Sequence, residues 1–126
     1  MKRLYLLERV KQRKNELGLT LDNISKLSRL GNRTVTRFFS GEDVKLSTLE
    51  KITEIMGLDF AGNETVDIDT LRDIRAKERA TYIVSLVQDT SALEMQGLGS
   101  KEIELLIADT KEQFLTGEYR KNLWAS

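Results

Sequence analysis

The chain has 126 residues with no cysteine, histidine or proline, and its 20 Lys and Arg residues balance 20 Asp and Glu residues. Without cysteine there is no disulfide or thiolate zinc site, and without histidine the most frequent general base and metal ligand is missing, so we expect no enzyme, no metal site and no cofactor. No apolar run approaches the ~20 residues that cross a membrane, and the N-terminal segment lacks the pattern of a signal peptide, so we expect a cytoplasmic protein.

The charge is unevenly distributed along the chain. Residues 1–56 contain twelve Lys and Arg against seven Asp and Glu, a net charge of +5, whereas residues 57–126 contain eight against thirteen, a net charge of −5. This asymmetry is typical of a basic binding surface joined to a neutral or acidic partner element. Long proline-free segments between glycines predict an all-α protein.

The first predicted helix runs from residue 2 or 3 to Leu17, and Gly18 is suited to end it because glycine adopts positive φ at low cost. We expect its basic side chains to lie on a solvated outer face, namely Lys11, Arg13 and Lys14. Its apolar stripe predicts the inward residues Leu6, Leu7, Val10 and Leu17.

Two short helices are predicted back to back, over residues 20–28 and 31–39. Thr20 is a suitable N-cap, but Asn23 stands where a capping box has Glu or Gln, so we expect an incomplete box. Helical spacing places the following residues inward: Leu21, Ile24 and Leu27 in the first helix, Val35 and Phe38 in the second. The second helix keeps polar and basic residues on its free face, which fits the major groove of DNA.

A loop from Ser40 to Lys45 precedes a fourth predicted helix, in which Ser47 and Glu50 form a capping box and which Gly57 ends. Composition changes from basic to acidic over residues 58–68, which we predict to be a linker with a short extended piece. The expected domains are therefore a DNA-binding domain at 1–58, a linker at 59–69 and a helical element at 70–126.

The C-terminal half is predicted to be helical over residues 70–88, although the apolar, β-branched run Y-I-V-S-L-V leaves a short strand as the alternative. A further helical turn is expected over residues 90–96. The last helix is predicted to begin with Ser100 as its cap and to end near Gly117. Tyr119 and Trp124 either anchor an interface or fold back onto that helix.

Residues 20–41 resemble the helix-turn-helix of the lambda-repressor-like (Cro-like) family, which is common in phage and bacterial regulators, and the wider resemblance covers about residues 3–58. It implies a compact four- to five-helix DNA-binding domain followed here by a smaller helical element. The matching features are an apolar-then-small pair, an apolar turn residue, a buried recognition-helix residue and a glycine-terminated helix end: Ile24 and Ser25, Leu30, Val35, and Phe38, Ser40 and Gly41.

Three positions depart from the family pattern. Leu21 stands where the family often has a Gln that binds a phosphate. Arg29 replaces the usual glycine of the turn, at a cost of about 1 kcal/mol if the residue is left-handed. Gly31 replaces the usual Ser or Thr cap and is a few tenths of a kcal/mol worse.

The resemblance implies a recognition helix over about residues 31–39, whose first turn lies nearest the bases. We expect base contacts from Asn32, Arg33, Thr36 and Arg37, since Asn pairs bidentately with adenine and Arg with guanine. Phosphate contacts are expected from Thr20, Ser40 and Lys45.

The leading interpretation is a sequence-specific transcriptional regulator, a repressor, that binds double-stranded DNA as a homodimer. The acidic C-terminal helices are the natural dimer contact, although the fourth helix and the loop after it are an alternative. The second interpretation is an antitoxin-like interaction module, whose C-terminal half binds a protein partner and whose N-terminal half represses its own operon.

Overall fold

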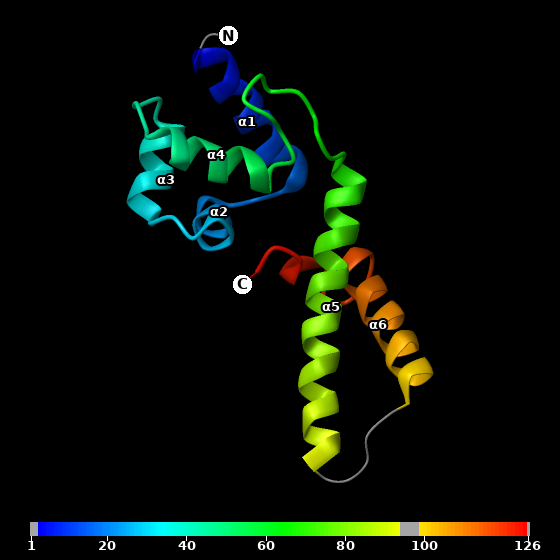
Figure 1. The fold of residues 1–126 in the computed structure, drawn as a ribbon. Coiled ribbons are helices and arrows are strands. Elements are labelled where there is room, and N and C mark those ends of the chain that lie inside the picture. The colour runs from blue at the N-terminus through cyan, green and yellow to red at the C-terminus, as the bar shows by residue number, and fades with distance from the viewer. Residues whose placement is uncertain (1–2, 94–98, 126) are drawn as a thin grey trace. The chain divides into compact units, whose positions relative to one another are not determined.

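The computed structural model describes residues 3–93 and 99–125, with side chains for 5–87 and 99–125. Every regular element in these ranges is a helix (Figure 1), which confirms the predicted all-α class. The chain divides into two compact units, one formed by residues 1–68 with 124–126 and the other by residues 69–123.

The first unit contains four α-helices: α1 (Arg3–Leu17), α2 (Leu21–Ser28), α3 (Asn32–Phe39) and α4 (Leu46–Ile55). Helix α2 packs against α3 and α4, and α1 packs against α3. The core confirms most of the residues expected to lie inward, and each such side chain contributes about 1.5–3 kcal/mol by leaving water. They are Leu6, Leu7, Val10, Leu17, Ile24, Val35 and Phe38, whereas Leu21 and Leu27 are only half-buried. Ile52 and Met56, in α4 and directly after it, are buried as well.

Arg13 was predicted on the solvated face of α1, and this prediction is wrong, because its side chain is 0% exposed. Its Nε donates to the carbonyl of Met56 at 2.8 Å, its Nη1 to the carboxylate of Glu64 at 3.0 Å, and its Nη2 to the carbonyl of Val66. One turn earlier, Arg9 Nε donates to the carbonyl of Gly62 at 3.1 Å. Because these bonds hold the chain after α4 against α1, the guanidinium of Arg13 is enclosed.

The segment predicted as a linker therefore packs onto the first unit as far as Val66. A single antiparallel bridge between Leu58 and Glu64 forms the short extended piece that we expected there. Leu58 is buried, and the backbone N–H groups of Thr65 and Val66 both donate to the carbonyl of Gly57. These contacts make the segment part of the folded unit.

Two helix starts have other caps than expected, and a third has a more complete capping box. Thr20 caps α2 as predicted, but the capping box is complete, because the Asn23 amide oxygen accepts from the Thr20 N–H at 3.0 Å just as a Glu would. The box predicted at Ser47 is wrong, because α4 begins at Leu46 and has the extended Lys45, two residues before Ser47, as its N-cap. Ser100 is not a cap either, because it is the first residue of its helix, whose N-cap is Gly99.

The second unit contains α5 (Ile68–Leu93), α6 (Ser100–Leu115) and a short 3-10 helix, η1 (Arg120–Asn122). The run Tyr82–Val87 lies inside α5, so the strand alternative is excluded. The helical turn expected over residues 90–96 is the last turn of α5 as far as Leu93, and residues 94–96 lie outside the described part of the chain.

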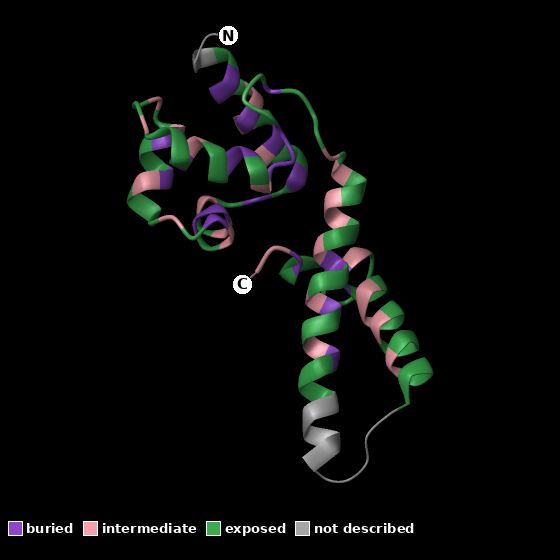
Figure 2. Ribbon diagram, in the orientation of Figure 1, coloured by how far each residue is buried: buried purple, intermediate pink, exposed green. Residues whose placement is uncertain are grey.

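Within the second unit, few of the described side chains are fully buried, and Figure 2 shows those of α5 as narrow bands among exposed residues. An ion pair between Lys111 Nζ and Asp73 at 2.6 Å joins α6 to α5. A hydrogen bond from Arg75 Nε to the carbonyl of Leu123 at 2.9 Å joins α5 to the residue that follows η1. Burial and the nearby Arg79 lower the pKa of Arg75, while Glu78 opposes that shift. The buried residues of this unit are Ala76, Ala80, Val84, Phe114 and Leu123.

The two C-terminal aromatic residues have different contacts. The Tyr119 ring lies 5.3 Å from the Phe114 ring, so Tyr119 folds back onto α6. Trp124 belongs to the first unit, where its indole Nε1 donates to the carbonyl of Leu17 at 3.0 Å. Trp124 therefore satisfies a carbonyl at the C-terminal end of α1, where helical carbonyls lack partners within the helix.

Candidate nucleic-acid interface

The interface is built on a tight turn between α2 and α3. Arg29 adopts the left-handed conformation, with φ 60° and ψ 27°, and the Leu30 N–H donates to the carbonyl of Ser25 at 3.1 Å. The buried Ser25 hydroxyl donates back to the Leu30 carbonyl at 2.6 Å. A small hydroxyl residue at this position therefore both allows α2 to approach the turn and satisfies one of its carbonyls.

The first turn of α3 has no side-chain cap. Gly31 is its N-cap in an extended conformation, as predicted, and it makes no side-chain hydrogen bond. The amide N–H groups at a helix start carry partial positive charge and lack partners within the helix. This end of α3 is therefore suited to face a polyanion.

All four residues predicted to contact bases lie exposed on α3, namely Asn32, Arg33, Thr36 and Arg37. Their opposite face is held by Val35 and Phe38, which are 0% and 6% exposed. Anchoring on one face and exposure on the other fix the orientation of the helix, so the four side chains share one solvent-facing surface.

The three predicted phosphate residues are also exposed, but their hydroxyl and ammonium groups differ in availability. The Thr20 hydroxyl accepts from the Asn23 N–H at 3.0 Å, which leaves its own proton to be donated. The Ser40 hydroxyl already donates to the carbonyl of Thr36 at 2.9 Å, so a phosphate must displace that bond. Lys45 caps the start of α4 and has no ion-pair partner among the described residues.

Between α3 and α4 lies a hollow of about 310 Å³ that joins two of these cations. Arg37 and Lys45 both line it, together with the hydroxyl residues Thr34 and Thr48 and the carboxylate of Asp43. The cations and hydroxyl donors around this hollow are suited to a phosphate oxygen, whereas the Asp43 carboxylate opposes one.

Sequence reasoning missed two residues of this surface. Glu42 Oε1 lies 3.5 Å from Arg37 Nε, so one of the four expected base-contacting side chains has an acidic neighbour. Arg29 is exposed in the turn itself and adds a further cation beside α3. The sequence S-G-E after the helix could have indicated the position of Glu42. A glycine that ends a helix turns the chain back over the last helical turn and so places the next residue near it.

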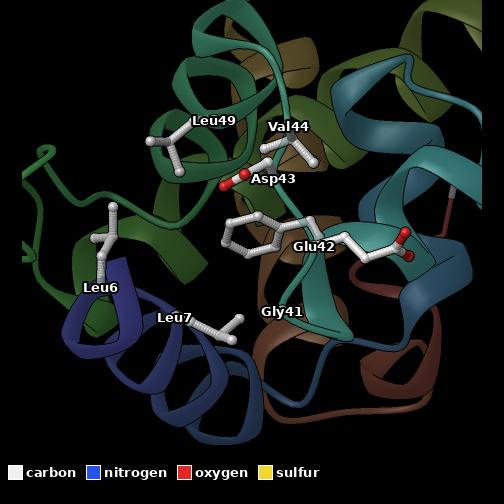
Figure 3. Close-up of a pocket in the computed structure, with 8 residues that line it drawn as sticks. Leu6, Leu7, Gly41, Glu42, Asp43, Val44 and Leu49 are labelled. Carbon is white, nitrogen blue, oxygen red and sulfur yellow. The ribbon is translucent and has the colours of Figure 1, made fainter. Parts of the chain in front are cut away.

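A second, apolar pocket lies behind the loop that follows α3. Figure 3 shows the side chains of Leu6 and Leu7 from α1 facing Val44 and Leu49 across it. Its volume is about 80 Å³, which is smaller than the roughly 150 Å³ of a cavity that holds benzene. We therefore assign it to core packing.

Over the described residues, no group of three or more His, Cys, Asp and Glu side chains is placed to hold a metal ion. In the same residues no helix has both the length and the apolar character that a membrane span needs.

The amino-acid sequence of this chain is similar to that of a protein named as a transcriptional regulator. The chain is 38% identical over 69 residues to an Archaeoglobus fulgidus protein named "Putative HTH-type transcriptional regulatory protein". The match covers 55% of this chain but only 21% of that protein. The similarity supports a relationship to helix-turn-helix regulators, while the specific Cro-like assignment has no counterpart in the comparison.

No family model matches the chain, and no solved structure matches it.

Proposed function

We propose that this chain is a sequence-specific regulator of transcription that binds double-stranded DNA through α3. The observation that carries the proposal is the exposed polar and basic face of α3, held by the buried Val35 and Phe38 behind a three-residue turn. A helix of this size and polarity fits the major groove, where base pairs present distinct patterns of donors and acceptors. The similarity to a protein named as a regulator supports the same function.

In this proposal Asn32 and Arg33 contact base edges from the first turn of α3, and Thr36 and Arg37 contact the next bases or phosphates. Arg33 is suited to guanine, because its guanidinium has no ion-pair partner among the described residues and is free to form a bidentate pair. We favour repression, because a protein bound at a promoter blocks RNA polymerase from the DNA. Activation would need an additional surface that contacts the polymerase.

We also propose that the second unit assembles two copies of the chain. Six large apolar side chains on α5 and α6 are 37–64% exposed: Ile74, Tyr82, Leu86, Val87, Leu105 and Leu106. A pair of helices with a small core gains stability when such a surface is covered. A dimer would also place two recognition helices on half-sites about 34 Å apart, which raises affinity for an operator with two-fold symmetry.

The DNA-binding proposal is tested by selecting duplexes from a random library with the wild-type chain and measuring affinity by fluorescence anisotropy. Arg33→Ala should weaken binding to the selected duplex by about 10- to 100-fold and binding to random duplex much less, because a bidentate base contact discriminates by about 1–3 kcal/mol. Lys51→Ala, which removes an exposed cation from α4, is the matched control and should leave the ratio of the two affinities unchanged. Equal losses on both duplexes, or no binding to any duplex at moderate salt, would refute base contact by Arg33.

The assembly proposal is tested by sedimentation equilibrium. The wild-type chain should sediment as a dimer and Leu105→Glu, a change at a 64% exposed side chain, as a folded monomer. A wild-type monomer at about 100 μM would refute self-assembly. A stoichiometric complex with a different protein, lost in the same variant, would instead support the antitoxin-like interaction module.

A further inference from the structure

Glu42 is placed beside Arg37 by the way α3 ends. Gly41 adopts φ 89°, its N–H donates to the carbonyl of Phe38 at 3.0 Å, and the Glu42 N–H donates to the carbonyl of Arg37 at 3.1 Å. These bonds form the Schellman arrangement, in which a left-handed glycine turns the chain back over the last helical turn. The backbone of Glu42 is thereby tied to that of Arg37.

The side chains of the same two residues also meet. Glu42 Oε1 lies 3.5 Å from Arg37 Nε, and the two side chains are 54% and 53% exposed. Glu42 belongs to the lining of the apolar pocket, but Figure 3 shows its carboxylate directed away from Leu6 and Leu7. The carboxylate is therefore not needed to fill the core, and its contact is with a cation of the proposed recognition helix.

The two arginines on the exposed face of α3 therefore differ in their ion pairing. Arg33, in the first turn, has no ion-pair partner in the described part of the chain, whereas Arg37, one turn later, is paired. The other charged groups around Arg37 are Asp43 and Lys45, which line the same hollow. Any contact of Arg37 with DNA must compete with Glu42, and it also brings the Glu42 carboxylate towards a phosphate.

We propose that Glu42 is a specificity-determining residue, which competes with DNA for Arg37 and so suppresses binding to unrelated sequences. Binding to random DNA is almost entirely electrostatic, so a paired cation and an added negative charge both weaken it. A bidentate contact with guanine is strong enough to displace a half-exposed ion pair, whereas a loose contact with a phosphate gains less. This inference rests on the proposed DNA-binding function and assigns a role within the same surface.

The test compares Glu42→Gln with wild type at about 150 mM salt on the selected duplex and on random duplex. Glutamine keeps the size and the backbone bonds of Glu42 but removes the charge. Binding to random duplex should strengthen about threefold, with a salt slope steeper by about 1, and the preference for the selected duplex should fall by a similar factor.

Two controls separate this role from a general change in charge. Glu54→Gln removes one carboxylate from the exposed surface of α4 that lines a different hollow, and it should strengthen random binding much less, because the Debye length is only about 8 Å at this salt. In an Arg37→Ala background, Glu42→Gln should strengthen random binding much less than it does beside Arg37, because only the negative charge of Glu42 is then removed. Circular dichroism checks that each variant is folded.

The outcomes are distinct. An equal gain from Glu54→Gln, or a full Glu42→Gln gain in the Arg37→Ala background, overturns the proposed competition. An unchanged preference in Glu42→Gln, with the selected duplex still bound by wild type, overturns this inference and leaves the DNA-binding function standing. Absence of any duplex binding by wild type overturns both.

Discussion

Replacing the buried Arg13 by methionine should destabilise the first unit strongly. Methionine has a similar length and fills most of the same space, but it donates no hydrogen bond. The substitution therefore removes the bonds from α1 to the carbonyls of Met56 and Val66 and to the carboxylate of Glu64, with little loss of packing.

The size of the expected loss of stability follows from the environment of each hydrogen-bond acceptor. A hydrogen bond from a charged donor is worth about 1.5–3 kcal/mol, and a buried carbonyl left without a partner costs about 1–3 kcal/mol. The Glu64 side chain is 43% exposed, so water can replace Arg13 at that carboxylate at small cost. Removing a buried charge offsets part of the loss, which leaves an expected destabilisation of about 2–4 kcal/mol.

Urea unfolding followed by the fluorescence of Trp124 measures this effect, because that residue is the chain's single tryptophan and belongs to the first unit. The urea concentration at the midpoint of unfolding should fall by about 1–2 M, while the dependence of the unfolding free energy on urea concentration stays constant. Lys11→Met is the matched control, since it removes a 43% exposed cation from the same helix and should change stability by less than about 0.5 kcal/mol. A loss below about 1 kcal/mol in Arg13→Met would contradict the account of the enclosed guanidinium.

Three further substitutions test the stability of the first unit, each by urea unfolding followed by circular dichroism at 222 nm. Thr20→Ala should cost about 1 kcal/mol because it removes the acceptor for the Asn23 N–H, while Thr20→Ser should cost little, and equal losses would argue against the cap. Arg29→Gly should stabilise by about 0.5–1 kcal/mol because the residue is left-handed, and a loss would contradict strain at the turn. Trp124→Phe should cost about 1 kcal/mol because it removes the donor to the Leu17 carbonyl, and no change would show that this bond is not needed.

The helices could be predicted from sequence because their signals are local. The apolar spacing in α1, α2 and α3 identified most of their buried residues, and glycines with positive φ, such as Gly18 and Gly41, mark helix ends in both the pattern and the structure. The exposed face of α3 followed from the same spacing, because fixing Val35 and Phe38 inward determines which residues point outward.

The parts that sequence reasoning missed depend on partners that local patterns do not contain. Arg13 reads as a surface residue because its hydrogen-bond acceptors lie 43 to 53 positions further along the chain. The polar composition of the segment after α4 likewise gives no sign that its backbone carbonyls accept hydrogen bonds from Arg9 and Arg13. The N-caps lie one or two residues before the serines expected to fill them, Ser100 and Ser47, which is the usual variation of helix ends.

The central claim, that α3 contacts DNA bases, is tested most directly by nuclear magnetic resonance of the ¹⁵N-labelled chain titrated with the selected duplex. The account predicts that the backbone amide signals of residues 31–37 and the side-chain signals of Asn32 and Arg33 change most, and that random duplex perturbs the Asn32 and Arg33 side-chain signals far less. Changes concentrated in α5 and α6, or side-chain changes at Asn32 and Arg33 that are the same for both duplexes, would contradict it.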